Sequence, residues 1–148
     1  MNKHQPVSAQ TVSDIERLLR EISVIVKYKG REILTHFPIT PPQFSALLWL
    51  EEEGDLTIGE LSQKMYLACS TMTDLIDRME KNGVVERVRD DRDRRVVRIH
   101  LLKKGVEIIT EVMEARCEYL ENVLSRLSDD EATEIKKYLS ILFEEMKR

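Results

Sequence analysis

The sequence contains few cysteines, glycines, prolines and aromatic residues. Its 148 residues include 2 cysteines, 5 glycines and 4 prolines, and only 5% of them are aromatic. Cys69 and Cys117 provide neither a disulfide framework nor a CxxC motif, which predicts reduced thiols in a cytoplasmic protein. The three histidines, His4, His36 and His100, are too scattered to predict a metal cluster, and we expect no cofactor.

Long apolar runs are also missing. No stretch approaches the roughly 18 apolar residues that a membrane-spanning helix requires, so we expect no membrane contact. The first residues, MNKHQPVSAQTVSD, lack the apolar centre of a signal peptide, which predicts a protein that is not exported. A hydrophobic content of 42% with 34% charged residues is typical of a globular, helix-rich protein.

Negative charge is in slight excess, but the charges are unevenly distributed. The net charge of the whole chain is -4. Between Thr57 and Lys104, 11 lysines and arginines stand against 8 aspartates and glutamates, which gives this segment a charge of +3 and the remainder -7. A basic middle between acidic ends indicates that the middle meets an anion.

Helix-start signals divide the chain. A capping box pairs Ser or Thr with Glu or Gln three residues later, and it occurs at Ser13–Glu16, Thr40–Gln43, Thr57–Glu60 and Ser128–Glu131. Apolar residues at helical spacing follow each box. They predict a long first helix ending near Phe37-Pro38, a second over 41–53, a short third in TIGELSQKM, a fourth in STMTDLIDRMEKNG, and two more beyond Lys103.

The apolar period changes between the fourth and fifth helices. VVERVR and VVRIHL alternate apolar and polar residues, as half-buried strands do, and DDRDRR between them predicts a charged hairpin tip. The fold class is therefore mainly α with a small β-hairpin wing, a winged helix-turn-helix at 39–103. The apolar stripes of 1–38 and 104–148 are too long for one small domain to cover, which predicts a helical dimerisation region.

The fourth helix is a candidate DNA-contacting element. Its apolar residues Met72, Leu75, Ile76 and Met79 are expected to face the core. Its outer side then carries Ser70, Thr71, Thr73, Asp74, Asp77, Arg78 and Lys81. Small hydroxyl residues suit a helix whose first turn meets base edges and phosphates. Taken alone, however, they are better explained as helix caps.

The stretch RVRDDRDRRVVRIHL, residues 87–101, contains six arginines and three aspartates. Guanidinium groups suit phosphates and narrow minor grooves, whereas a solvated surface network is the alternative. An interleaved aspartate can hold an arginine in the pose that a groove requires. With a helix-turn-helix immediately upstream, DNA contact is the better interpretation.

These residues resemble the recognition helix and wing of the MarR family of bacterial transcriptional regulators. The segment STMTDLIDRMEKNGVVERVRDDRDRRVVRIHLLKKG carries the family's D-x-R-D-R-R wing, with Asp90 or Asp91 at the first acidic position. Chain length, helix order and terminal helices match as well. One departure is Leu102, which stands where family members usually have a threonine that caps the fifth helix.

The resemblance implies a homodimer, usually a repressor, on the two-fold related half-sites of a pseudo-palindromic double-stranded DNA operator. One recognition helix per subunit would enter the major groove, and a wing arginine the adjacent minor groove. Arg95 matches the wing-tip arginine, Asp93 is placed to orient it, and Arg78 and Arg94 are expected at the DNA backbone. The candidate DNA-binding residues are Ser70, Thr71, Thr73, Asp74, Arg78, Arg92, Asp93, Arg94 and Arg95.

Many such regulators release DNA when a small aromatic or phenolic effector binds, and others when a cysteine is oxidised. Residues that could line an effector cleft are Tyr28, His36, Phe37, Phe44 and Trp49, although core packing is the better explanation for each alone. Cys69, at the start of the recognition helix, is a candidate redox site. We favour a small buried role for Cys69, and we expect Cys117 in the core.

Two other functions compete with DNA binding. A winged-helix protein-protein interaction module would use the same surfaces without DNA, and its binding would not fall steeply with salt. An enzyme is the weaker alternative, because no Ser/His/Asp, Cys/His or paired-carboxylate signature is present.

Overall fold

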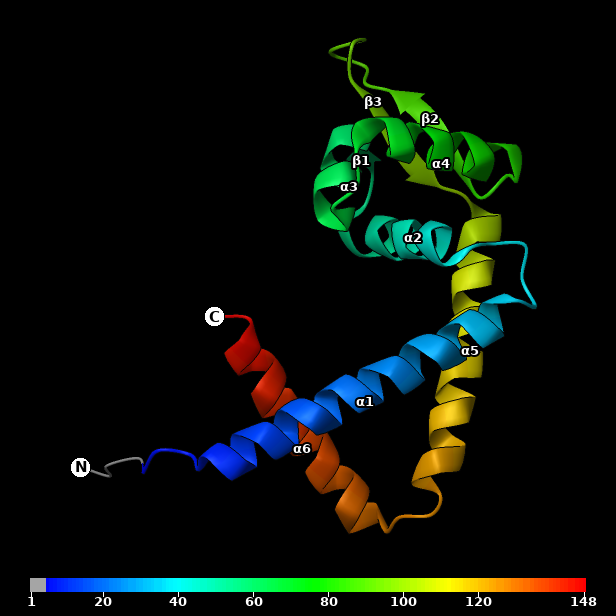
Figure 1. Cartoon of the computed structure of the whole chain (residues 1–148). Coiled ribbons are helices and arrows are strands. Elements are labelled where there is room, and N and C mark those ends of the chain that lie inside the picture. Colours follow the sequence, from blue (N-terminus) through cyan, green and yellow to red (C-terminus); the bar gives the residue numbers. More distant parts are fainter. Residues whose placement is uncertain (1–4) are drawn as a thin grey trace. The chain divides into compact units, whose positions relative to one another are not determined.

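The computed structural model describes residues 5–148 (Figure 1). Its elements follow in the order α1 (Ala9–Leu34), α2 (Pro41–Glu53), β1 (Leu56–Thr57), α3 (Ile58–Met65), α4 (Cys69–Lys81), β2 (Val85–Arg89), β3 (Val97–Leu101), α5 (Lys103–Leu124) and α6 (Asp129–Met146). This mainly helical chain with a small antiparallel sheet confirms the predicted fold class. No helix in the described part of the chain is both long and apolar enough to cross a membrane.

The chain packs as two compact units, one up to Thr110 and the other from Glu111 to Arg148. The boundary falls inside α5, which begins at Lys103. The division of the sequence into 39–103 for DNA binding and 1–38 plus 104–148 for dimerisation concerns function and stays a prediction.

Three helices begin where a capping box predicts. Thr40 Oγ1 accepts a hydrogen bond from the Gln43 amide at 3.4 Å, and the Gln43 side chain accepts one from the Thr40 amide at 3.1 Å, which caps α2. Ser128 and Glu131 form the same reciprocal pair at α6. Thr57 caps α3 by accepting a hydrogen bond from the Glu60 amide, without the reciprocal bond. Such caps stabilise a helix by about 1 kcal/mol each.

The predicted limits of the first helix are wrong. It begins at Ala9 rather than after Ser13, because Ser8 caps it by accepting a hydrogen bond from the Thr11 amide at 3.2 Å. It ends at Leu34, and a turn follows before α2.

A single apolar core holds the helix-turn-helix together. The residues that are 0% exposed are Ala46 and Leu47 of α2, Leu61 of α3, Met72, Ile76 and Met79 of α4, and Ile99 of β3. Each large apolar side chain buried in this way stabilises the fold by about 1.5–3 kcal/mol. The inward face predicted for α4 is therefore confirmed at three positions, with Leu75 half-buried.

The predicted hairpin forms as β2 and β3, with Val85 opposite Leu101 and Arg89 opposite Val97. The sequence interpretation missed β1, a two-residue strand that pairs Leu56 with Ile99 and makes β3 the central strand of the order β1-β3-β2. Figure 1 shows the hairpin strands lying behind α4 and extending beyond it as the wing.

Both units carry exposed apolar side chains. Exposed apolar residues of α1 include Leu18, Ile22 and Ile25, and those of α6 include Tyr138, Leu139 and Phe143. The helix α6 contains no buried residue. Cys117, expected in the core, is instead exposed, because the unit from Glu111 onward buries little of its surface.

Candidate nucleic-acid interface

In the lobe formed by the helix-turn-helix and its wing (residues 39–103), the outer side of the N-terminal half of α4 faces solvent. Its N-terminal half exposes Ser70, Thr71, Thr73 and Asp74, and Arg78 is exposed one turn further on. Thr73 Oγ1 donates a hydrogen bond to the Cys69 carbonyl at 2.9 Å, and the residue remains exposed. The structure thus brings the five predicted α4 residues to one solvent-facing side.

The first turn of α4 lacks a side-chain cap. The N-cap residue is Ala68, and no side chain accepts a hydrogen bond from the first turn there. Ser70 and Thr71 lie inside the helix, so the alternative that they act as N-caps is wrong. The backbone amides of this turn and the positive end of the helix dipole remain able to attract a phosphate.

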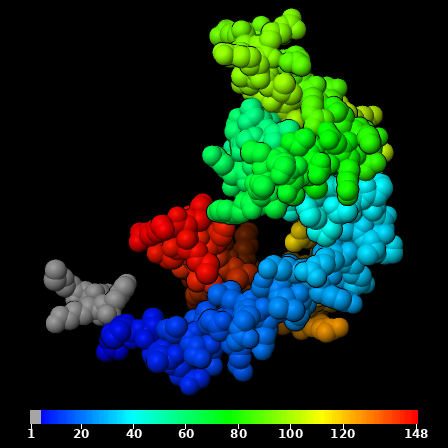
Figure 2. Space-filling model, turned by 45° about the horizontal axis from the view of Figure 1, so that its top comes forward, coloured from blue at the N-terminus to red at the C-terminus, as the bar shows by residue number. Residues whose placement is uncertain are grey.

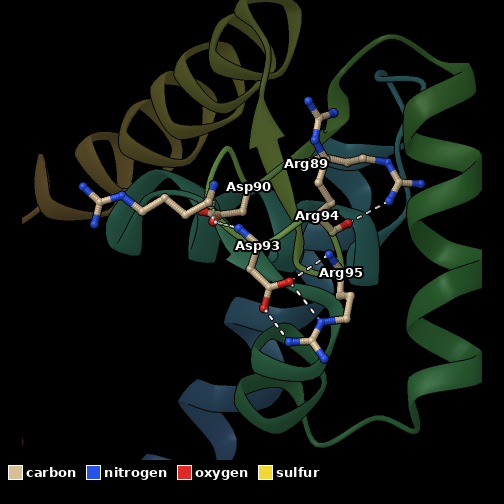
Figure 3. Close-up of polar contacts among 6 residues, drawn as sticks. Arg89, Asp90, Asp93, Arg94 and Arg95 are labelled. Carbon is tan, nitrogen blue, oxygen red and sulfur yellow. Dashed lines mark hydrogen bonds and ion pairs between the residues drawn. The ribbon is translucent and has the colours of Figure 1, made fainter.

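Arg95 is presented at the wing tip by Asp93. Asp93 Oδ1 accepts from Arg95 Nε at 3.1 Å and from the Arg95 amide at 3.1 Å, while Oδ2 accepts from Arg95 Nη2 at 3.2 Å (Figure 3). These bonds lower the pKa of the Asp93 carboxyl, the guanidinium contributing most. The Arg95 side chain nevertheless stays 91% exposed. An arginine that is both oriented and solvated can enter a groove with little loss of side-chain entropy.

Asp90 closes the loop that carries this pair. Its Oδ2 accepts hydrogen bonds from the Asp93 amide at 2.8 Å and the Arg92 amide at 3.1 Å, and its Oδ1 accepts from Arg98 Nη1 at 2.7 Å. The Asp93 amide, then the Arg98 guanidinium, lower the pKa of the Asp90 carboxyl. Asp90 rather than Asp91 therefore makes the local bonds of the wing motif, in the form of an aspartate turn. The sequence had left open which of the two occupies the first acidic position.

Arg87 ties the wing to α4. Its Nη2 donates to Asp77 Oδ1 at 2.6 Å, and its Nη1 donates to Glu80 Oε1 at 2.7 Å. The Arg87 amide also donates to Glu80 Oε2 at 3.1 Å. These contacts join β2 to α4, so the hairpin and the helix present their outer surfaces as one body. The sequence interpretation missed this role, because it grouped Arg87 with the other arginines of the wing.

The six arginines therefore divide into two groups. Arg87, Arg89 and Arg98 bond within the lobe, Arg89 through the Arg94 carbonyl at 2.9 Å. The side chains of Arg92 and Arg94 form no hydrogen bond or ion pair with any residue from 5 to 148. Together with Arg95 they leave three exposed guanidinium groups at the tip, which stands out from the lobe in Figure 2.

Cys69 differs from its expected burial. It is exposed, because it begins α4 where the core residues of that helix have not yet started. It borders a surface hollow of about 620 Å³ that Gly59 and Gln63 of α3 also line.

The predicted effector residues do not share one environment. Phe44 is buried in the core, which supports the packing explanation, and Trp49 is half-buried, with Lys64 Nζ 4.9 Å from its ring centre. Tyr28 and His36 are exposed, and Phe37 is half-buried. An effector cleft formed by them stays a prediction. Among residues 5–148, no group of three or more His, Cys, Asp or Glu could hold a metal ion; His4 lies outside the described residues.

The exposed helix α4, the wing that is ion-paired to it and the arginine-rich wing tip define a winged helix-turn-helix DNA-binding protein. Comparison with known proteins agrees. The MarR family pattern matches residues 39–97. The HTH-type transcriptional regulator YsmB of Bacillus subtilis (strain 168) is 61% identical over 137 residues, which cover 93% of this chain and 94% of YsmB.

A second relative, the HTH-type transcriptional repressor MdtR of the same organism, is 28% identical over 82% of this chain and 79% of its own. The solved structure of a MarR family protein from Bacillus stearothermophilus is 57% identical, with a TM-score of 0.89 over 97% of this chain and 100% of that one. The chain belongs to the MarR family and is a helix-turn-helix transcriptional regulator.

Proposed function

We propose that two copies of this chain bind a pseudo-palindromic operator and repress transcription there. In each copy the outer side of α4 enters the major groove, and Arg95 enters the adjacent minor groove. The observation that carries this proposal is the Asp93–Arg95 pair, in which a guanidinium is oriented through two nitrogens yet remains 91% exposed. A surface ion pair contributes little to stability, so its geometry is better explained by presentation to a ligand.

Charge supports the same surface. The segment from Thr57 to Lys104 is basic in a chain of net charge -4, and the exposed Arg92, Arg94 and Arg95 gather at its wing tip. A basic surface on an acidic protein attracts the DNA backbone locally while the rest of the chain is repelled.

Homodimer formation is supported by the exposed apolar residues of α1, α5 and α6. Isolated apolar side chains on a surface are ordinary, but contiguous ones mark an interaction surface. On α6, residues Ile135, Tyr138, Leu139 and Met146 recur at helical spacing, and each is more than 40% exposed. A second copy of the chain provides the two-fold symmetry that a pseudo-palindromic operator requires.

Repression and effector release extend the proposal. The relative MdtR is described as a repressor, and this supports the same role here. A small aromatic or phenolic compound, or oxidation of the exposed Cys69, would lower DNA affinity. The substitution Cys69→Ser tests oxidation: if the variant still loses DNA in peroxide, Cys69 is not the sensor.

A selection from random duplexes followed by footprinting tests the proposed function. We expect an inverted repeat with half-sites about 34 Å apart, one turn of the double helix. A single asymmetric footprint would contradict the two-fold arrangement. Selection of no common sequence, together with binding that does not change with salt, would favour the protein-protein interaction module.

A further inference from the structure

The line of α4 that lies farthest from the core has an unusual composition. Residues spaced by four, three and four positions follow one line along a helix. The line directly opposite the buried Met72, Ile76 and Met79 contains Ser70, Asp74, Asp77 and Lys81. If α4 enters the major groove, this line reaches deepest. Two of its four side chains are carboxylates, although the groove is lined by phosphates on both sides.

The two carboxylates are in different situations. Asp77 accepts from Arg87 Nη2 at 2.6 Å, so its charge is offset within the lobe. Asp74 makes no hydrogen bond or ion pair with any described residue, and Arg78, one helical turn further on, does not pair with it. Asp74 therefore carries an uncompensated negative charge to the middle of the surface proposed to meet DNA.

A free carboxylate at this place repels the phosphate backbone, and it lowers affinity for every sequence alike unless a base offsets it. An ionised carboxylate only accepts hydrogen bonds. In the major groove the exocyclic amines of cytosine and adenine are the donors. Adenine presents the acceptor N7 next to its N6 amine, and that lone pair repels a carboxylate. Cytosine carries no acceptor of its own on this edge: its N4 amine lies between the C5–H group and the O6 of the paired guanine, so a carboxylate can approach from the C5–H side.

We propose that Asp74 determines operator sequence by accepting a hydrogen bond from the N4 amine of a cytosine in each half-site. The proposal rests on the proposed function, because it assigns a base to one residue of the same DNA-binding surface. Asp74 contributes to specificity rather than to affinity. Its charge lowers affinity for DNA of any sequence, and the hydrogen bond to the cytosine offsets this loss only at the operator.

Selection from random duplexes with four proteins tests the base assignment. The wild-type protein is compared with Asp74→Ala, Asp74→Asn and the control Asp91→Asn. Asp91 is exposed at the wing, so its substitution removes the same charge away from α4. We expect wild type and Asp91→Asn to prefer cytosine at one position of each half-site, by about tenfold over other bases.

The two Asp74 variants should differ from wild type in distinct ways. Asp74→Ala should lose the preference at that position alone while binding random DNA more tightly, because one repulsive charge is gone. Asp74→Asn should change the preference to adenine, because an amide both accepts from N6 and donates to N7. Retention of the wild-type preference at every position by both variants would overturn the assignment.

A base analogue tests the atom itself. In the selected duplex, the cytosine is replaced by a pyrimidinone analogue that lacks the 4-amino group. We expect wild-type affinity to fall about tenfold, and the affinity of Asp74→Ala to change little, since that protein reports any effect on the duplex alone. Equal losses for both proteins would contradict the proposal.

The outcomes separate the two proposals. If wild type selects no common sequence, the proposed function itself fails. If wild type selects an inverted repeat but neither the Asp74 substitutions nor the analogue alters one position specifically, only the role of Asp74 fails.

Discussion

We predict that two residues at the wing tip carry separable parts of DNA affinity. Arg95 supplies the charge, and Asp93 supplies its orientation through bonds of 3.1 and 3.2 Å to the guanidinium. Substitution of either residue should lower affinity, but only substitution of Arg95 should change the dependence of affinity on salt.

We predict that Arg95→Ala weakens operator binding about tenfold and reduces the slope of log affinity against log salt by about 1. Asp93→Ala should also weaken specific binding, because Arg95 loses its orientation, but the salt slope should not fall, because the guanidinium remains. Fluorescence anisotropy titrations at several salt concentrations measure both quantities. Identical slopes for wild type and Arg95→Ala would show that Arg95 does not lie at the DNA.

We predict that His100 makes the stability of the lobe weakly dependent on pH. Its Nδ1 lies 2.8 Å from Asp55 Oδ1, and this hydrogen bond, then the charges of Asp55 and Glu86, raise the pKa of His100. A raised folded-state pKa means that the extra stability is fully present below the unfolded value of about 6.5 and is lost as pH rises through the folded value. Because the side chains are 47% and 44% exposed, the effect should not exceed about 1 kcal/mol.

Urea unfolding between pH 5.5 and 8.5 checks this prediction. The free energy of unfolding of the wild type should decline across the range relative to Asp55→Asn, in which the pair is absent. Parallel pH profiles for the two proteins would show that the pair does not stabilise the lobe.

At the scale of the element, two glycines in helices have opposite roles. A side-chain carbon added at Gly105, in the first turn of α5, would lie 2.6 Å from the Val84 carbonyl oxygen and 2.7 Å from Leu101 Cδ1. At Gly30, within α1, it would meet nothing within 4 Å. The glycine at 105 is needed for close packing of α5 on the sheet, and the one at 30 is not.

Gly105→Ala should therefore destabilise the protein by about 1–3 kcal/mol through overpacking against a backbone atom. Gly30→Ala is the matched control and should stabilise it by about 0.5–1 kcal/mol, because alanine is the better helix former. Chemical denaturation measures the free energy of unfolding of the two variants and of wild type. A Gly105→Ala protein as stable as wild type would contradict the close packing at Gly105.

Most of these elements could be predicted from the sequence, because each satisfies a local rule. Thr40 and Ser128 begin helices through side chains three residues from their partners, and the strands of the hairpin alternate in apolar character. The strand β1 could not be predicted, because two residues establish no period. The start of α1 was misplaced, because Ser8 caps the helix before Ser13 without a glutamate or glutamine three residues later.

The residues of the site could be predicted from the sequence, but not which of them form hydrogen bonds and ion pairs with one another. Spacing indicated the outer side of α4, and the resemblance to the MarR family indicated the placement of Asp93 beside Arg95. Which arginines are held by other elements depends on contacts between elements, such as those of Arg87 in β2 with Asp77 and Glu80 in α4. The exposure of Cys69 could not be predicted, because it depends on where the core ends along α4, and the sequence of one helix does not show this.

At the scale of the whole molecule, α6 exposes several large apolar side chains and contains no buried residue. Leu139 is 54% exposed in the chain by itself. We predict that the protein has twice its chain mass of 17.3 kDa in solution and that Leu139→Glu shifts it toward the single chain. The control Thr133→Glu adds the same charge at another exposed position of α6 and should remain a dimer. Sedimentation equilibrium distinguishes these states, and a monomeric wild type would contradict dimerisation.

The most direct test of DNA binding by this chain is a titration of the purified protein into its selected duplex at salt concentrations from 50 to about 200 mM. If the protein binds as a homodimer, two chains should bind each duplex. If three exposed guanidinium groups per copy contact the phosphates, affinity should fall by orders of magnitude over that range. Binding that is absent in the lowest salt, or that is unchanged across the range, would contradict the conclusion that α4 and the wing form a DNA-binding surface.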